Sequence, residues 1–217
     1  MSRRTMPTFH PSPNDDGQPV LIRQPSTPTS LFAWDDPQQV ATVVPGGALP
    51  AVLNGVPLAP WDEAPVTGQG WSACAAYPDL DEPPYVLPPG YAAAAGAVIL
   101  EDDGRVWLVA PSNHFGGYAA TFPKGRVDPG TSLPYASVRE AFEESGLQVR
   151  IVGFLLDTTR TQTHTRYYVA RRVGGTPARM GWESQAVHLV PAARLRELAV
   201  HPNDEAVIRA LERWLAK

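Results

Sequence analysis

Hydrophobic residues in the second half of the chain occur in short runs separated by turn residues. Runs of this length that are rich in β-branched and aromatic residues are typical of strands. The run 92–100 is alanine-rich, but Gly96, the β-branched residues after it and the turn at Asp102-Asp103-Gly104 favour a strand that returns as a hairpin. The predicted strands span residues 92–100, 105–110, 119–123, 148–157, 165–173 and 186–191.

Three segments between and after these strands indicate helices. The segment 134–145 starts with a proline, which the first turn of a helix tolerates, and Thr131 or Ser132 is placed to cap it. Gly146 follows as a residue that can adopt the left-handed conformation at a helix end. A short helix is predicted over 192–200, and apolar residues at helical spacing predict an amphipathic helix over 204–216. This order predicts an α/β domain over residues 91–217.

The first 90 residues have a different character. Residues 1–30 are rich in Pro, Ser, Thr and Gln, and we predict a flexible arm because such a composition buries too little apolar surface to offset its ordering entropy. Residues 31–90 predict a small β-rich subdomain, with a strand at 40–44 and a hairpin at Asn54-Gly55. It ends in a stiff proline-rich connector, residues 78–90.

The aromatic residues of this subdomain allow two interpretations. Buried aromatic side chains are common, so we interpret the subdomain as scaffolding, either a cover on the following domain or a dimer interface. The alternative is that one of its tryptophans or tyrosines stacks on a substrate base.

Composition and charge narrow the class of protein. A net charge of −4 and a pI of about 5.7 argue against a protein that binds a nucleic-acid groove. Cys74 is the single cysteine, so no intrachain disulfide is possible. The chain has no apolar run long enough for a membrane span, and its basic start is followed by prolines instead of an apolar signal core. We therefore expect a soluble cytoplasmic protein with no membrane partner.

Candidate chemistry is concentrated in the helix predicted over 134–145. Residues three and four apart share a helix face, so Glu140, Glu143 and Glu144 point the same way. Like charges on one face repel, and a bound cation would relieve that repulsion. Carboxylate oxygens suit Mg²⁺ or Mn²⁺. The preceding loop, FPKGRVDPG, brings backbone N–H groups with Lys124 and Arg126, an arrangement that is typical of phosphate binding.

The stretch 125–147 resembles the Nudix box, G-x5-E-x7-R-E-U-x-E-E-x-G-U, in which U is a bulky apolar residue. Two positions depart from the pattern: Thr131 stands at the first glutamate, and Ala141 replaces a larger aliphatic residue. The resemblance extends from about Tyr91 to the C-terminus and leaves the first 90 residues uncovered. The matching residues are Gly125, Arg139, Glu140, Glu143, Glu144, Gly146 and Leu147.

The resemblance implies both a fold and a reaction. The fold is an α/β/α sandwich around a mixed sheet, here preceded by a small proline-rich, β-containing N-terminal region. The reaction is hydrolysis of a pyrophosphate bond in a nucleoside diphosphate linked to another group. The implied cofactor is Mg²⁺ or Mn²⁺, because an acidic site can hold the anionic substrate only through divalent cations.

The resemblance also assigns roles within the box. Glu140, Glu143 and Glu144 are the implied metal ligands, and the Gly125 carbonyl is a candidate further ligand. One of these glutamates, or a glutamate elsewhere, deprotonates the attacking water. Arg139 resembles the arginine that orients a box glutamate; its alternative role is an ordinary helix charge. Because Thr131 lacks the usual charge, we expect Arg139 to pair with Glu143 or another carboxylate.

Several residues outside the box are candidates for substrate or catalytic contacts. Glu183 is a candidate auxiliary ligand or base, or else a plain loop carboxylate. Lys124 and Arg126 are candidates for phosphate contacts, with solvated surface charges as the alternative. Histidines and arginines on two loops and a strand could also face the substrate, depending on strand register. They are His114, His164, Arg160 and Arg166.

The sequence is compatible with several classes of substrate. The lysine before the box glycine resembles Nudix enzymes that cleave diadenosine or diphosphoinositol polyphosphates, which favours a dinucleoside polyphosphate-like small molecule. The alternatives are an ADP-ribose or nucleotide-sugar pyrophosphatase, of the kind that dimerises through an N-terminal segment, and a non-catalytic Nudix domain that senses a nucleotide. A homodimer through residues 1–90 is therefore a further expectation.

Overall fold

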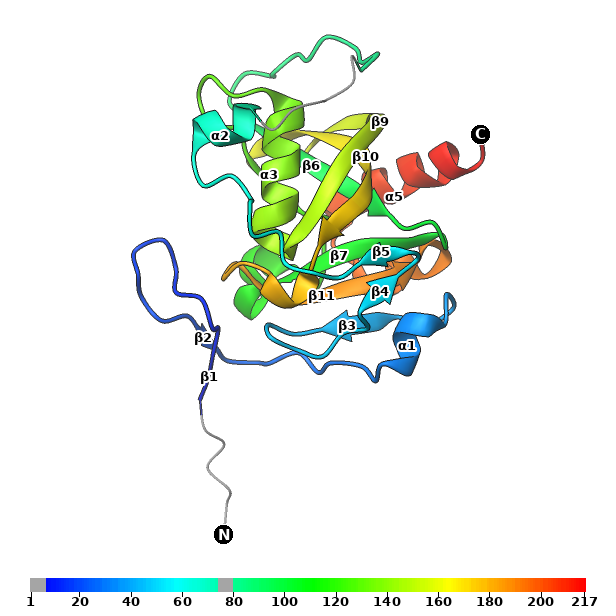
Figure 1. Cartoon of the computed structure of the whole chain (residues 1–217). Coiled ribbons are helices and arrows are strands. Elements are labelled where there is room, and N and C mark those ends of the chain that lie inside the picture. Colours follow the sequence, from blue (N-terminus) through cyan, green and yellow to red (C-terminus); the bar gives the residue numbers. More distant parts are fainter. Residues whose placement is uncertain (1–6, 74–79) are drawn as a thin grey trace.

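The computed structural model describes residues 7–73 and 80–217, so Cys74 and Tyr77 lie outside the described residues. Its centre is a mixed seven-stranded sheet with the order β3-β11-β7-β6-β10-β9, in which β8 also pairs with β6 (Figure 1). The parallel pair is β6 with β10. The strands of this sheet are β3 (Ala41–Val43), β6 (Ala92–Leu100), β7 (Arg105–Pro111), β8 (Lys124–Arg126), β9 (Leu147–Thr159), β10 (Thr163–Gly175) and β11 (Ser184–Pro191).

Helices cover both faces of the sheet. The face with Ala97 and Ile99 packs against α3, whereas the face with Val98 and Leu100 packs against α4 and α5. This alternation follows from the period of two along a strand, and it places α3 and α5 on opposite sides of the sheet (Figure 1). The expected α/β/α sandwich is confirmed. The helices are α1 (Phe32–Asp35), α2 (Gly68–Ala73), α3 (Leu133–Ser145), α4 (Leu195–Leu198) and α5 (Pro202–Leu215), with 3₁₀ turns η1 (Ser112–Gly117), η2 (Pro177–Arg179) and η3 (Ala192–Arg194).

The strand and helix predictions hold with two corrections, one to a strand and one to a helix. The alanine-rich run is a strand, β6, and the hairpin to β7 turns at Gly104, which has φ +83°. Residues 119–123 do not form the predicted strand, and Thr121 makes only an isolated bridge to Val109. The strand in this part of the chain is β8, which follows at Lys124–Arg126. The helix predicted over 192–200 is divided into η3 and α4.

Residues 7–30, which the sequence predicts as part of a flexible arm, follow a defined path in the structure. They form a two-stranded hairpin of β1 (Thr8–Phe9) and β2 (Leu21–Ile22). The backbone of Arg23 donates to Asn113 Oδ1 at 2.8 Å, and Gln185 Nε2 donates to the Gln24 carbonyl at 3.0 Å. The segment therefore satisfies its polar groups on side chains of the following domain, an interaction that its own composition does not reveal.

The region 31–90 is likewise joined to the sheet instead of forming a separate unit. Strand β3 pairs with β11 at the sheet edge, so part of this region lies within the main sheet. The Asn54-Gly55 hairpin is confirmed: β4 (Val52–Leu53) and β5 (Val56–Pro57) flank a turn in which both central residues have positive φ. Trp34 and Trp71 are buried in the same core cluster as α3, which supports the scaffolding interpretation.

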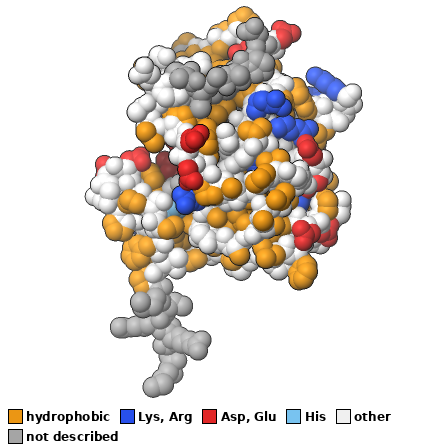
Figure 2. Space-filling view, viewed as in Figure 1, with side chains coloured by type: hydrophobic (Ala, Val, Ile, Leu, Met, Phe, Trp, Pro, Cys, Tyr) orange, Lys and Arg blue, Asp and Glu red, His pale blue; other side chains and the backbone are white. Residues whose placement is uncertain are grey.

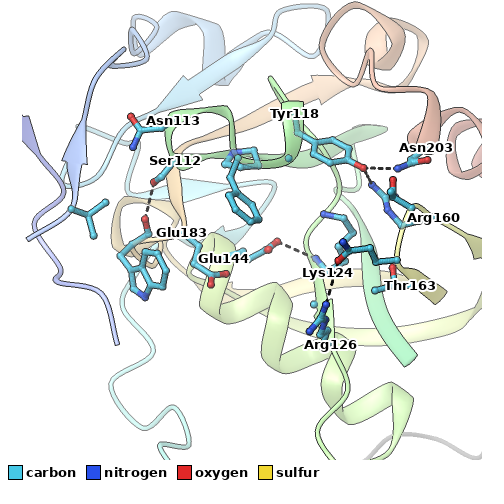
Figure 3. Close-up of a pocket in the computed structure, with 18 residues that line it drawn as sticks. Ser112, Asn113, Tyr118, Lys124, Arg126, Glu144, Arg160, Thr163, Glu183 and Asn203 are labelled. Atoms are coloured by element: carbon cyan, nitrogen blue, oxygen red, sulfur yellow. Dashed lines mark hydrogen bonds between the residues drawn. The ribbon is translucent and has the colours of Figure 1, made fainter. Parts of the chain in front are cut away.

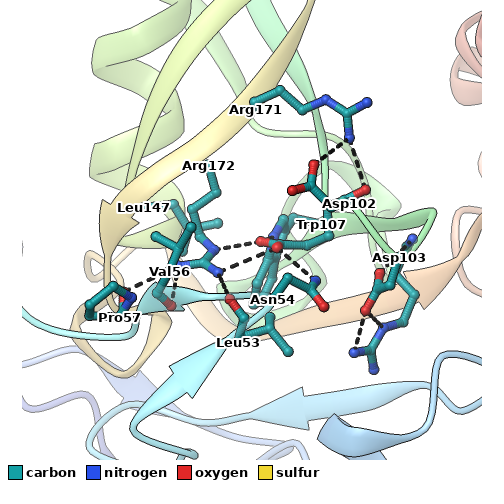
Figure 4. Close-up of polar contacts among 12 residues, drawn as sticks. Leu53, Asn54, Val56, Pro57, Asp102, Asp103, Trp107, Leu147, Arg171 and Arg172 are labelled. Carbon is teal, nitrogen blue, oxygen red and sulfur yellow. Dashed lines mark hydrogen bonds and ion pairs between the residues drawn. The ribbon is translucent and has the colours of Figure 1, made fainter.

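A buried polar cluster fastens the β4–β5 hairpin to the sheet (Figure 4). Glu101, 4% exposed, accepts hydrogen bonds from Arg172 Nε at 2.5 Å, Trp107 Nε1 at 2.8 Å and Asn54 Nδ2 at 3.0 Å. Arg172 in turn donates to the carbonyls of Leu53, at 2.8 Å, and Pro57, at 3.2 Å. We call these side chains the Glu101 cluster. It is a hydrogen-bonded ion pair whose donors and acceptors are matched.

The surface agrees with the modest charge of the chain. On the face shown in Figure 2, acidic and basic side chains form small separate groups among apolar and uncharged ones. Within the described part of the chain, no helix is both long and apolar enough to cross a membrane.

Candidate active site

The predicted motif folds as a strand, a turn and a helix. β8 leads through a proline-glycine turn into α3, where Ser132 is the N-cap: its Oγ accepts from the Tyr135 backbone N–H at 3.4 Å. Gly146 ends the helix with φ 72°, in the left-handed conformation. Both ends of the helix are as predicted, so the three glutamates lie on the turns that were expected.

Glu140 lies directly against the backbone of Gly125. A Cβ atom at Gly125 would meet Glu140 Oε2 at 2.0 Å, so only glycine leaves room for this carboxylate. Burial raises the pKa of Glu140; Arg139 opposes that rise, and the charges of Glu183 and Asp128 add to it. The glycine of the motif thus leaves room for the Glu140 carboxylate against the backbone.

The other two box glutamates continue this acidic face. Glu144 Oε2 accepts a hydrogen bond from the Lys124 backbone N–H at 3.0 Å. Burial raises the pKa of Glu144, with Lys124 opposing and Glu140 adding to the rise. Partial burial and the charge of Glu140 raise the pKa of Glu143 to about 7, although its side chain is half exposed. Each carboxylate is therefore held close to another, a cost that a cation would remove.

Arg139 contacts carboxylates on two sides. Its Nη2 donates to Glu140 Oε1 at 2.9 Å, and its Nε lies 3.5 Å from Glu143 Oε2. Its Nη1 donates to Asp128 Oδ2, from the loop before α3. Sequence reasoning left open which carboxylate replaces the glutamate missing at Thr131; in the structure Asp128 is such a partner.

Glu183 joins this group from another part of the chain. It lies just before β11 and lines the same cavity as Glu144. Its charge contributes to the raised pKa of all three box glutamates. Burial raises the pKa of Glu183 itself, and the charge of Asp15 adds to the effect.

Gly125, Glu144 and Glu183 line a cavity of about 900 Å³. Glu144 and Glu183 lie at one side of it, Lys124 lies between them and the far side, and Arg160 lies at the far side (Figure 3). Arg126 also lines the cavity. The cavity therefore runs from an acidic side to a basic side, and Lys124 and Arg126 line it as predicted candidates.

The far side is built around Tyr118. Its hydroxyl accepts from Arg160 Nη2 and from Asn203 Nδ2, each at 2.8 Å. Arg160 Nη1 lies 3.0 Å from Asp204 Oδ1 in a buried ion pair. The ring of His201 stacks on Tyr118 with centroids 4.0 Å apart. Arg160 is thus fixed in position at the cavity wall.

Three of the candidates for substrate contacts are not part of the cavity lining, and Glu140, Glu143 and Arg139 of the box do not line it either. Arg166 is 1% exposed and forms ion pairs with Asp157, at 2.7 Å, and with Glu82, at 3.2 Å, so its role is structural. The register of β10 points its side chain away from the cavity. His114 is an exposed residue of η1 outside the lining, although its neighbours belong to it. The ring of His164 lies 5.4 Å from that of Tyr85, also outside the cavity.

Several other residues that line the cavity were not predicted from the sequence. Tyr118 and Asn203 come from a loop and a helix start that are far apart in the chain, and Trp182 neighbours Glu183. Val20 comes from the segment that was expected to be flexible. Asp128 could have been found, because a carboxylate three residues before Thr131 is the nearest substitute for its missing charge.

The donor set fits a hard divalent cation. Glu140 lies against the backbone of Gly125, Glu143 and Glu144 follow on the same helix, and oxygen donors suit Mg²⁺ or Mn²⁺. Among the described residues, however, no three acidic, histidine or cysteine side chains are already arranged around one point. In this arrangement the Glu140 carboxylate is hydrogen-bonded to Arg139.

Fold and site together define an α/β protein with a carboxylate-bearing helix beside a nucleotide-sized cavity. The sequence model described as "NUDIX domain" matches residues 90–211. An RNA pyrophosphohydrolase of Cronobacter sakazakii is 36% identical over 115 residues, which cover 53% of this chain and 58% of the relative. One of Caulobacter vibrioides is 35% identical over 92 residues, which cover 42% and 50%. The chain belongs to the Nudix family.

Solved structures show related arrangements at lower identity. An Ap4A hydrolase of C. elegans aligns with a TM-score of 0.47 and 21% identity, covering 58% of this chain and 98% of that one. An ADP-ribose pyrophosphatase of Streptococcus suis aligns with a TM-score of 0.45 and 18% identity, covering 56% and 91%. The curated relatives reported above are matched over half to three fifths of their own length.

Proposed function

We propose that this protein hydrolyses a pyrophosphate bond in a nucleotide substrate, with Mg²⁺ or Mn²⁺ as cofactor. The observation that carries this proposal is the contact between Glu140 and Gly125, with Glu143 and Glu144 beside it, at the acidic side of a large cavity. Family membership supports the reaction class, and the resemblance of residues 125–147 to the Nudix box supports the choice of ligands.

The chain's own groups divide the chemistry among them. Glu140, Glu143, Glu144 and the Gly125 carbonyl would hold the cation. A bound divalent cation neutralises phosphate charge and lowers the pKa of a water. Glu143 or Glu183 accepts the proton of the attacking water. Lys124 attracts the phosphates and keeps them in line with the carboxylates.

We propose that the substrate carries a chain of several phosphates, as in a dinucleoside polyphosphate. Lys124 and Arg126 line the cavity beyond the carboxylates and together suit a polyanion longer than the bond that is cleaved, whereas the charge of Arg160 is already paired with Asp204. The volume of about 900 Å³ accommodates a nucleotide. An ADP-ribose or nucleotide-sugar substrate, with only two phosphates, would leave part of this basic wall unused.

A second candidate is the 5′-polyphosphate end of an RNA. It is favoured by the 36% identity to a relative named RNA pyrophosphohydrolase. A chain with a net charge of −4 attracts an RNA backbone only weakly. For this substrate, the cavity would therefore bind the terminal nucleotide, and the rest of the RNA would add little to the affinity. Both candidates present the same chemistry to the site, a nucleoside with an extended phosphate chain.

A substrate panel separates these possibilities. Diadenosine tetraphosphate, a 5′-triphosphate RNA oligonucleotide and ADP-ribose would each be incubated with the protein and Mg²⁺ or Mn²⁺, and the products resolved by chromatography. We expect kcat/KM to be highest for a substrate with three or more phosphates. Preference for ADP-ribose would contradict the polyphosphate proposal. Tight nucleotide binding without turnover of any substrate would instead identify a nucleotide sensor.

A further inference from the structure

Arg139 has a carboxylate partner at a position that the box pattern leaves variable, and its Nη2 also donates to the Arg126 carbonyl at 3.4 Å. Glu140 and Glu143 are on the same helix as Arg139, and both are candidate metal ligands. Asp128 approaches from the other side, from the loop between β8 and α3. Its side chain is 59% exposed and that of Arg139 is 15% exposed, so their contact lies at the rim of the site.

Thr131 fixes the backbone of this loop. Its N–H and its Oγ1 both donate to the Asp128 carbonyl, at 3.1 Å and 2.7 Å. Proline follows Asp128, and Gly130 has φ +82°, which is the pattern of a type II turn. The threonine that stands at the position of the missing glutamate therefore closes the turn from which Asp128 reaches Arg139.

This contact determines where the arginine can go. Arg139 has Asp128 on one side and Glu140 on the other, with Glu143 further away at 3.5 Å. Without Asp128, the guanidinium would be free to pair closely with Glu143. Such a pair would engage Glu143 closely, whereas Glu140 offers Arg139 one oxygen, Oε1, and keeps Oε2 against Gly125.

We propose that Asp128 is a positioning residue that replaces the first glutamate of the Nudix box. It anchors Arg139 so that Arg139 orients Glu140 against Gly125 and leaves Glu143 available. Thr131 and Asp128 together thus perform what a single glutamate performs in the family pattern. This inference rests on the proposed function, because it assigns Asp128 a role in cation binding.

The first test measures Mn²⁺ affinity of the full chain without substrate, from the paramagnetic signal of free Mn²⁺. We expect Asp128→Ala to weaken Mn²⁺ binding about 10-fold, a typical cost for a residue that supports a ligand, and to lower kcat more than it changes KM. Asp128→Asn, which keeps the shape and loses the charge, should fall between wild type and Asp128→Ala. It also carries the test if Asp128→Ala fails to fold.

The matched control is Asp102→Ala. Asp102 is an exposed aspartate that also pairs with an arginine, Arg171, at 3.5 Å, and it lies in the β6–β7 turn. Its removal should leave Mn²⁺ affinity and turnover unchanged. Equal losses in the two alanine variants would show a general charge effect and would overturn the proposal.

A double-mutant cycle asks whether Asp128 acts through Arg139. In an Arg139→Gln background, Asp128→Ala should have no further effect on Mn²⁺ affinity. An undiminished effect in that background would overturn the positioning role. The cycle distinguishes this role from a direct contact of Asp128 with the cation.

Restoring the family pattern is the last test. Thr131→Glu added to Asp128→Ala should recover most of the lost Mn²⁺ affinity, and failure to recover any would overturn the equivalence of the two positions. Wild-type protein that binds no Mn²⁺ would overturn the proposed function itself. Wild-type binding that Asp128→Ala leaves unchanged would overturn only the inference about Asp128.

Discussion

Two clusters of arginine and glutamate in this molecule differ in how completely their carboxylates are bonded. Both oxygens of Glu101 accept hydrogen bonds, from Arg172, Trp107 and Asn54, and the pair is buried (Figure 4). In the box, the carboxylates instead stand close to one another, and burial with mutual repulsion raises the pKa of each.

The difference distinguishes a structural ion pair from a binding site. Where each charged atom has a partner, nothing is left for a ligand, and loss of one member leaves an unpaired buried charge. Where carboxylates repel one another, their removal relieves strain and their function requires an additional cation. The two clusters should therefore respond in opposite ways to the same substitution, glutamate to glutamine.

The largest expected effect is on turnover, at Glu144. Glu144→Gln should lower kcat/KM by more than about 1,000-fold, equivalent to roughly 4 kcal/mol, because a ligand to the catalytic cation is lost. Its unfolding free energy should stay the same or rise, since a repelled charge is removed. Steady-state kinetics and urea unfolding measure the two quantities. Substantial turnover in this variant would contradict the ligand assignment.

The second expected effect is on stability, at Glu101. Glu101→Gln should lower the unfolding free energy by about 3 kcal/mol, because Arg172 then stays buried without its counter-charge. Urea unfolding measures the loss, and Mn²⁺ affinity of the folded fraction should not change. Asp102→Asn, at the exposed neighbouring position, is the control. Loss of Mn²⁺ affinity in Glu101→Gln would show that the clusters are coupled.

A smaller effect is expected at Gly125. Gly125→Ala should weaken Mn²⁺ binding about 10-fold, because the added Cβ displaces the Glu140 carboxylate from its place. Gly68→Ala is the control, since a Cβ there would make only an ordinary contact at 3.8 Å with the Tyr135 hydroxyl. Equal Mn²⁺ affinity in wild type and Gly125→Ala would show that Glu140 does not need this position.

The smallest effect concerns pH. The pKa of Glu143 is raised to about 7 in the folded protein, so the folded state binds more protons than the unfolded state between about pH 4.5 and 7. This group therefore stabilises metal-free protein progressively as pH falls through 7. The gain should stay below about 1 kcal/mol because the side chain is half exposed. The difference in unfolding free energy between wild type and Glu143→Gln, measured from pH 8 to 5, should show it; a difference independent of pH would contradict it.

Sequence reasoning succeeded where local patterns determine structure. The Gly96 run and the Asn54-Gly55 turn have short-range signals, and both formed as predicted. Prediction from the sequence failed where contacts between residues far apart in the chain determine the structure. The register of β10 turned Arg166 toward Asp157 and away from the cavity, and the order of residues 7–30 depends on partners such as Asn113 and Gln185.

In the site, too, local spacing was predictable and contacts that depend on the path of the backbone were not. The spacing of Glu140, Glu143 and Glu144 was sufficient to place them on one helix face, because a helix has a fixed period. The sequence could nominate Asp128 as the substitute for the glutamate missing at Thr131, but confirming its contact with Arg139 required knowing the direction of a turn. Asp128 is close in sequence, but its contact with Arg139 depends on the backbone at Gly130.

Val20 lines the cavity, yet it lies 70 residues before the start of the segment that matches the family, residues 90–211. The unit that defines the family and the unit that encloses the cavity therefore have different boundaries. Recombination that moved only the matching segment into another protein would transfer the box but leave part of the cavity wall behind. The reaction and its selectivity can thus be inherited separately, and changes in the N-terminal segment could alter substrate choice while the catalytic helix stays the same.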